Sequence, residues 1–424
     1  MKDNHAEYNK YLEYWAQTRI FVEGLKDVQD YLQNVTNIPD SLNLKRNADY
    51  KRRAKYTNFP GRTRNALVGA VFRKDPKQEI IGGLSFLENN INGAGLPLLQ
   101  LSKHLVTNLI EIGRHGLFVD YGDNAKIVTY KAEKIPYWET DEAGNLTKVK
   151  LLKGESKEDY KILKLEDGVY SIDIYIEDKF SENIEVSKSD GTKFNEIPFI
   201  FCGSTDNSPD VDDVVLWPIV DMSQGHFQNS ADYEDLLRYL MPTPAVTVPN
   251  KQWMDEILPN GVYSFGDGSI IPIPEGGSAM LLQANENQMH QKAMQHKEEL
   301  LIKLGARIIS DSTGVETAEA ARIKFSSENS ILDNLAQNAS MAIEKCLEWC
   351  GMFEGVQGDN LYELNRDFFD SIMTAQEITA MIMLEDRGTI AKTDSREKLR
   401  RTGYITRDDD EIDADAEVNT GLES

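Results

Sequence analysis

Residues 305–350 read GARIISDSTGVETAEAARIKFSSENSILDNLAQNASMAIEKCLEWC. The stretch begins with glycine and hydroxyl side chains and then becomes strongly patterned. Thr313 and Glu316 have the spacing of a capping box, in which two side chains satisfy free N–H groups at a helix start. Apolar residues then recur at steps of three, four or seven, so one face of this helix is expected to be buried along its length. These residues are Ala321, Phe325, Leu332, Leu335, Ala339, Ala342, Cys346 and Trp349.

Two more helices are predicted upstream of this stretch. The first covers residues 213–240, with Pro218 in its first turn and an end before Pro242 and Pro244. Its narrow apolar seam consists of Ile219, Met222, His226, Tyr233, Leu237 and Leu240. The second carries one stripe made of Met289, Ala293, His296, Leu300 and Leu304, and Gly305 is placed to end it.

A compact insert separates these two helices. Residues 243–280 are rich in proline and glycine and contain the strand-like runs TPAVTV, GVYSF and SIIPI. The sequence therefore predicts two seam-bearing helices that flank a small β insert.

The N-terminal region combines helical pattern with basic charge. Residues 5–33 read as helical, and residues 45–76 interleave lysine and arginine with tyrosine and phenylalanine. Such a stretch is typical of a nucleic-acid site. The alternative is a basic helical face that pairs with acidic neighbours or an adjacent subunit, and the acidity of the whole chain favours this second interpretation.

The middle of the chain changes from helix to strand. Residues 96–121 predict a buried helix, then a turn at Gly113 to Gly116 and a short strand. Up to about residue 202, short β-branched and aromatic runs predict antiparallel strands, namely KIVTY, LTKVKLLK, VYSIDIYIED and IPFIFCG. Glu133, Lys134, Tyr137 and Trp138 fall here and are expected to be structural.

The C-terminal region is predicted to hold a strand near residues 361–373 and two short helices within 374–403. The acidic stretch 407–424 is expected to be disordered.

Bulk composition bounds the function. A chain of 424 residues has room for two or three domains, no apolar run approaches the roughly 20 residues that span a bilayer, and the N-terminus has no signal-type apolar core. We therefore expect no membrane contact and a cytoplasmic location. The net charge of −24 repels nucleic acid and disfavours an ordinary DNA-binding module. It is compatible with a protein that lets DNA pass without gripping it.

No catalytic motif is found in the sequence. It contains no GxxxxGK[ST], GxSxG or HExxH pattern, so we predict no catalytic residue and no cofactor. Five histidines are interpreted as helix-face or turn residues rather than bases: His104, His115, His226, His290 and His296.

Two clusters leave a metal site open as an alternative. Asp210, Asp212 and Asp213 could hold a divalent metal, but their turn-rich setting favours helix entry and solvation. Cys346 and Cys350 lie one helical turn apart, where burial as small hydrophobic residues is favoured over metal binding. We therefore predict no metal.

The order of elements resembles the portal protein of tailed double-stranded DNA bacteriophages, a ring at one capsid vertex. The phrases that carry the resemblance are NFPGRTRNALVGAVFRKDP, DVVLWPIVDMSQGHFQNSADYEDLLRYLMPTPAVTV and ETAEAARIKFSSENSILDNLAQNASMAIEKCLE. It implies an α+β portal fold with a β-rich wing, a two-helix stem, a small β clip, a long wing helix and a short helical crown.

The resemblance also implies domain boundaries. Residues 1–212 would form the wing, with its β-rich part at about 117–202, and 213–242 and 285–304 the stem helices on either side of a clip at 243–284. Residues 305–316 would be the tunnel loop, 317–373 the long wing helix and strand, 374–406 the crown, and 407–424 the acidic tail.

Site residues follow from the same resemblance. The tunnel loop would present Arg307, Ser310, Asp311, Ser312, Thr313 and Gly314 to moving DNA. The clip would dock a large terminase, and later adaptor proteins, through Trp253, Asp255, Glu256 and Asp267. Neighbouring subunits would meet along the stem at His226, Tyr233, Leu237, Met289, Ala293, His296 and Leu300.

The implied function is a passive conduit for DNA packaging and ejection. Its partners would be a homo-oligomeric ring of typically twelve subunits, the passing duplex, the large terminase, head-completion proteins, and the major capsid and scaffolding proteins. The protein would reside in the virion and, during assembly, in the host cytoplasm. The alternatives are a metal-dependent phage nuclease at Asp210, Asp212 and Asp213, or another structural head or adaptor protein.

Overall fold

The computed structural model describes residues 4–24, 26–35, 41–154, 156–239, 245–248, 252, 271–274, 289–304, 318–366, 368, 375–401, 405, 407–409 and 411–413. The chain forms two compact units, Met1–Leu364 and Asn365–Ser424. The larger unit contains both helices and β-sheets, so the mixed α+β class expected from the sequence is confirmed.

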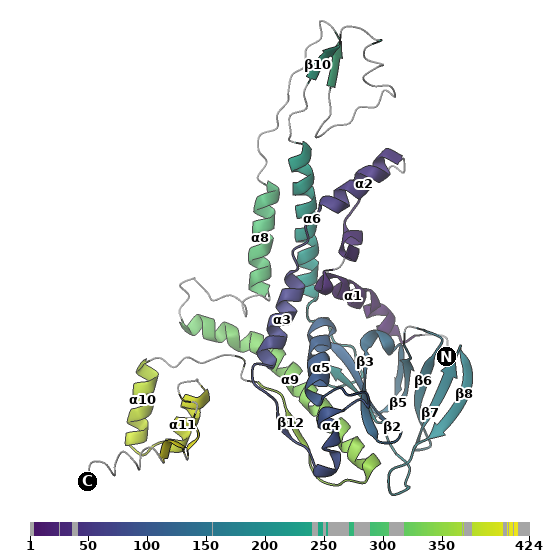
Figure 1. Ribbon diagram of the computed structural model, residues 1–424, viewed down its shortest axis with the longest axis vertical. Coiled ribbons are helices and arrows are strands. Elements are labelled where there is room, and N and C mark those ends of the chain that lie inside the picture. The colour runs from purple at the N-terminus through teal and green to yellow at the C-terminus, as the bar shows by residue number, and fades with distance from the viewer. Residues whose placement is uncertain are drawn as a thin grey trace. The chain divides into compact units, whose positions relative to one another are not determined.

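Four helices and a short strand open the larger unit (Figure 1). They are α1 (Ala6–Glu23), α2 (Ser41–Arg53), α3 (Phe59–Val71), β1 (Lys77–Glu79) and α4 (Phe86–Asn89), with the 3-10 turns η1 (Lys26–Tyr31) and η2 (Gly82–Leu84) between them. α1 packs on α3, and the helix that follows, α5 (Leu98–Ile112), packs on both α1 and α3. The basic stretch of the sequence, residues 45–76, runs through α2 and α3.

α5 forms and ends as its pattern predicts. Leu98, Leu101, Leu105, Leu109 and Ile112 are all fully buried. Gly113 ends the helix in the left-handed conformation, at φ 80°, and its N–H donates to the carbonyl of Leu109 at 2.8 Å. A Cβ there would lie 2.6 Å from the carbonyl oxygen of Asp213, so both backbone and space require glycine. The chain therefore turns directly from α5 into the first long strand.

Antiparallel strands follow, as the sequence predicts, and they form two sheets. The three-stranded sheet has the order β3-β2-β9, and the five-stranded sheet the order β4-β5-β6-β7-β8. Their strands are β2 (Arg114–Tyr121), β3 (Ala125–Lys131), β4 (Tyr137–Thr140), β5 (Leu146–Leu152), β6 (Tyr160–Glu166), β7 (Val169–Ile176), β8 (Lys179–Glu185) and β9 (Phe199–Gly203), with the 3-10 turn η3 (Ala132–Lys134) before β4. His115 is the one histidine placed wrongly by the sequence interpretation, because it lies in β2 rather than on a helix or turn.

The core lies where α5, the three-stranded sheet and a long helix meet. That helix, α9 (Ala318–Glu354), packs on β2, β9 and α5. Its residues Leu332, Leu335, Ala339, Ala342, Cys346 and Trp349 are buried, which confirms the predicted face where side chains are described. β12 (Leu361–Glu363) then pairs antiparallel with β1, nearly three hundred residues earlier in the chain.

The region between β9 and α9 contains the two helices predicted there. α6 (Trp217–Tyr239) has Pro218 in its first turn, and α8 (Met289–Leu304) lies beside it (Figure 1). Between them in sequence, β10 (Ala245–Val248) and β11 (Ile271–Pro274) pair in parallel.

The smaller unit contains α10 (Ala375–Asp386) and α11 (Lys392–Arg401), which pack on each other. These are the two short helices that the sequence predicts after residue 374. In the part of the chain that the structure describes, no helix is long and apolar enough to cross a bilayer.

Gly61 in α3 tests how tightly the N-terminal helices pack. Asn58 caps α3 by accepting from the N–H of Gly61 at 2.7 Å, and it donates to the carbonyl of Val22 at 2.8 Å. A Cβ on Gly61 would lie 2.5 Å from that same carbonyl oxygen. We expect Gly61→Ala to lower the free energy of unfolding by about 1–3 kcal/mol because the backbone of α1 must shift.

Gly69 is the matched control in the same helix. A Cβ there has nothing within 4 Å. Gly69→Ala should therefore leave stability unchanged or raise it by up to about 1 kcal/mol through helix propensity. Urea unfolding of both variants measures the difference, and equal effects would show that the close approach at Gly61 costs nothing.

Candidate functional site: the α6–α8 pair and its ion-pair clusters

Two of the three predicted sites fall outside the described residues. These are the tunnel-loop residues Arg307, Ser310, Asp311, Ser312, Thr313 and Gly314, and the clip residues Trp253, Asp255, Glu256 and Asp267. The third set, on α6 and α8, can be described side chain by side chain.

α6 and α8 contact each other through polar groups. The Lys297 amine donates to the carbonyl of Gly225 and to Oδ1 of Asn229, both at 2.7 Å. The buried His226 ring lies 3.0 Å from Oε1 of Glu298. Burial at this contact lowers the pKa of Lys297, against a weaker opposing effect of the Asp232 carboxylate. We call these five contacting residues, 225, 226, 229, 297 and 298, the α6–α8 lock.

Aliphatic side chains of the same two helices remain in solvent. Leu237 is 44% exposed and Met289 is 72% exposed, while Ile302 and Leu304 are 42% and 48% exposed. Leu301, in contrast, is fully buried. Of the other predicted interface residues, His296 is exposed, and Tyr233, Ala293 and Leu300 are half-buried. The pair thus has polar contacts between its helices and leaves an apolar set exposed: Leu237, Met289, Ile302 and Leu304.

The basic stretch of α2 is held by acidic residues of α6. Arg46 and Arg53 both pair with the Asp235 carboxylate, Arg53 at 2.5 Å. Tyr50 donates to Oδ1 of Asp232 at 2.6 Å, and burial together with that carboxylate raises the pKa of Tyr50. These contacts favour the interpretation of α2 as a basic face that pairs with acidic neighbours.

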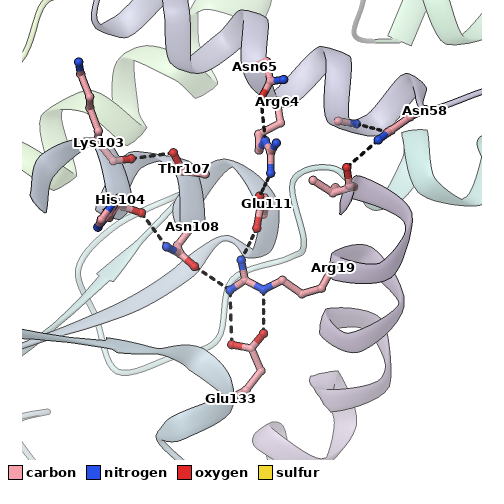
Figure 2. Close-up of polar contacts among 12 residues, drawn as sticks. Arg19, Asn58, Arg64, Asn65, Lys103, His104, Thr107, Asn108, Glu111 and Glu133 are labelled. Atoms are coloured by element: carbon pink, nitrogen blue, oxygen red, sulfur yellow. Dashed lines mark hydrogen bonds and ion pairs between the residues drawn. The ribbon is translucent and has the colours of Figure 1, made fainter. Parts of the chain in front are cut away.

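A second ion-pair cluster fastens α1 to α5 and η3 (Figure 2). Arg19 of α1 pairs with Glu111 of α5, and its Nε lies 2.9 Å from Oε1 of Glu133. It also donates to Oδ1 of Asn108 at 2.7 Å. Arg64 of α3 reaches the same Glu111 carboxylate at 2.6 Å. We call Arg19, Arg64, Asn108, Glu111 and Glu133 the Arg19 cluster.

Charges inside the Arg19 cluster shift each other's titration. Burial disfavours the ionised Glu133 carboxyl, but the Arg19 guanidinium outweighs burial and holds the pKa of Glu133 below its ordinary value. Burial likewise disfavours the charged Arg19, and the two carboxylates raise its pKa above the ordinary value. Both pKa shifts favour the charged forms of Arg19 and Glu133 at neutral pH.

Acid is expected to weaken the contribution of Glu133. Its pKa is lowered in the folded state, so its stabilising effect is present above the unfolded value of 4.5 and is lost as pH falls through the lower folded value. Glu133→Gln should therefore destabilise the protein at neutral pH, and the difference from the parent should shrink below pH 4.5. Urea unfolding at several pH values checks this, and a difference that stays constant with pH would contradict it.

The acidic residues near α6 have separate partners. Asp212 accepts from the N–H of Thr205 at 2.8 Å and from the Ser204 hydroxyl at 3.2 Å. Asp213 accepts from the Tyr11 hydroxyl at 3.0 Å. Over the described ranges, no group of three His, Cys, Asp or Glu side chains could hold a metal ion. These carboxylates hold the entry to α6, as the turn-rich setting favours.

Beneath that entry lies a buried arginine. Arg114 donates to the carbonyls of Asp210 at 2.6 Å and Pro209 at 2.8 Å, and its guanidinium lies 3.7 Å from the Phe201 ring centroid. Burial lowers the pKa of Arg114 to about 9. This arginine fastens the loop before α6 to the three-stranded sheet.

The remaining candidates are core residues. His115 is fully buried, and burial lowers its pKa to about 3, so it is neutral. Cys346 and Cys350 are free and fully buried, as expected of small hydrophobic residues.

Sequence reasoning missed the Arg19 cluster. Arg19 is 92 residues from Glu111 and 114 residues from Glu133 in the sequence, and each of these residues alone resembles a surface charge. The available signal was Glu111, an acidic residue beside the apolar stripe of a helix predicted to be buried.

Comparisons with known proteins give one family model and several solved structures. A family model described as "Domain of unknown function (DUF4055)" matches residues 216–354, which span α6 to α9. No curated protein matches the chain.

Three solved structures are similar to it. A chain of the neck of the native gene transfer agent particle, computed with C12 symmetry, has a TM-score of 0.42 at 13% identity and covers 87% of this chain and 95% of its own. A neck chain of the empty particle, computed with C6 symmetry, has a TM-score of 0.41 at 13% identity over 81% and 90%. A chain of the native gene transfer agent virion has a TM-score of 0.38 at 12% identity over 83% and 92%.

Proposed function

We propose that this chain is a phage portal protein, which forms a ring at one capsid vertex and serves as a conduit for double-stranded DNA. The observation that carries the proposal is the α6–α8 pair. Its lock is polar, and Leu237, Met289 and Leu304 stay in solvent. Covering exposed aliphatic groups with another protein surface removes them from water, which stabilises the complex.

We propose that a second copy of the chain covers these exposed aliphatic groups. A head-to-tail contact that closes on itself produces a ring, typically of twelve subunits in portals. His226 already contacts Glu298 in its own chain, so the contact with the neighbour is proposed to rest chiefly on Leu237, Met289 and His296, with Tyr233, Ala293 and Leu300 at its edge.

The role is that of a passive, non-enzymatic conduit. The net charge of −24 limits phosphate contacts, so a duplex can slide. Residues 305–316 are proposed to face the DNA. Trp253, Asp255, Glu256 and Asp267 are proposed to dock the large terminase and then head-completion proteins. The ring would sit among capsid and scaffolding proteins in the virion, after assembly in the host cytoplasm.

Native mass spectrometry with negative-stain imaging of the purified chain tests the proposal. Rings of about twelve copies with a central hole are expected, as for a closed cyclic assembly. A chain that stays monomeric at high concentration, with or without scaffold, would refute the ring.

The same preparation tests the two alternatives. A nuclease would cleave DNA in the presence of a divalent metal and lose that activity on alanine substitution at Asp210, Asp212 and Asp213. An adaptor or minor head protein would assemble normally after residues 243–284 are trimmed, whereas a portal would not dock terminase without them.

A further inference from the structure

The smaller unit holds an acidic segment against a basic helix. α11, KTDSREKLRR, carries five basic and two acidic residues in a chain whose net charge is −24. Arg396 Nη2 lies 2.5 Å from Oδ1 of Asp413, and its Nη1 lies 3.8 Å from Oδ1 of Asp409. Arg400 pairs with the same Asp409 carboxylate and donates from Nε to the carbonyl of Arg407 at 3.0 Å. The segment just after α11 thus occupies two of its guanidinium groups.

The acidic segment covers these arginines. The Arg396 and Arg400 side chains are only 19% and 31% exposed, whereas Asp413 is 61% exposed. Residues four apart share one face of a helix, with about 5–6 Å between their Cβ atoms. Removal of the carboxylates would present two adjacent guanidiniums, the group whose planar donors match phosphate oxygens.

We propose that this face of α11 is a site for the phosphates of duplex DNA, which Asp409 and Asp413 of the same chain keep covered. The two carboxylates stand where phosphate oxygens would lie. A tethered competitor acts at high effective concentration, so the covered state prevails until DNA supplies several phosphates together. The choice of duplex DNA as the ligand rests on the proposed function, whereas the contacts lie within the smaller unit alone, so ring imaging and the binding test can fail separately.

The test measures binding of a short fluorescein-labelled DNA duplex to the full chain by anisotropy over a salt series. Asp409→Asn with Asp413→Asn should tighten binding at low salt by about three- to tenfold, because two arginines gain phosphates. It should also steepen the slope of log affinity against log salt by about 1–2. Loosening of the segment would expose the same arginines, so the expected direction does not depend on its staying folded.

A matched control separates the site from bulk charge. Asp123→Asn with Asp359→Asn changes the net charge equally at two exposed residues of the larger unit. This variant should bind as the parent does. Equal tightening in the control would overturn the proposal by assigning the effect to net charge.

Removal of the arginines completes the test. Arg396→Gln with Arg400→Gln, added to the two asparagine substitutions, should return both affinity and salt slope to the parent values. A gain that persists without these arginines would place the DNA contact elsewhere and overturn the proposal.

Discussion

Replacement of Arg19 by methionine is expected to lower the free energy of unfolding by about 3–5 kcal/mol, the range seen when one partner of a buried ion pair is removed. Glu111 and Glu133 would lose the guanidinium that pairs with both of them. Methionine keeps an unbranched side chain of similar length, so the loss reports charge rather than packing. Urea unfolding followed by circular dichroism measures it, with an unchanged m-value as evidence that only stability changed.

Arg62 is the control for this substitution. It lies on α3 with an exposed side chain. Arg62→Met should change stability by no more than about 0.5 kcal/mol, as surface substitutions usually do. An equal loss at both positions would mean that the Arg19 cluster adds nothing beyond surface charge.

Substitution of glutamate for Leu237 and Met289 together is expected to convert rings to monomers. Each contact between copies would then have to desolvate two unpaired carboxylates in a chain that is already acidic. An uncompensated buried charge costs about 3–5 kcal/mol, so each contact should weaken by roughly a hundredfold or more. Native mass spectrometry at a fixed concentration measures the loss.

Exposed apolar residues away from the α6–α8 pair provide the comparison. Ile176 and Phe180 lie at the β7–β8 hairpin and are 52% and 57% exposed. Glutamate at both positions should leave rings intact. Rings that survive the Leu237 and Met289 substitutions would show that neighbouring copies meet on another surface.

Elements with strong local periodicity could be predicted from the sequence. The leucine stripe of α5 and the α9 face from Leu332 to Trp349 are both buried as expected, because each encodes its buried side within one helix. The antiparallel strands between α5 and α6 followed from short β-branched and aromatic runs separated by turns. In these cases the information that determines the element lies within a few neighbouring residues.

Contacts between distant segments could not be predicted. The sequence showed an apolar stripe on α8, but the polar contacts with α6 come from Lys297 and Glu298, which lie outside that stripe. An apolar stripe predicts a helix without specifying which neighbouring surface the helix will contact. Whether the basic stretch binds DNA or protein depended on Asp232 and Asp235, nearly 190 residues later. A buried ion pair can be predicted only when both of its partners are known.

The pairing of β1 with β12 constrains how the protein can be made. Lys77 lies opposite Glu363, and Tyr362 of β12 is fully buried and donates to the Ser102 hydroxyl at 2.8 Å. The core around α5 is also incomplete until α9 has been synthesised and packs on it. During synthesis, the first three hundred residues would therefore leave the ribosome with the faces of α5 and β2 that meet α9 still uncovered, a state prone to aggregation. The β1–β12 pairing and the packing of α9 on α5 are therefore late, long-range steps in folding. Slower translation would not make them occur earlier in the chain's synthesis.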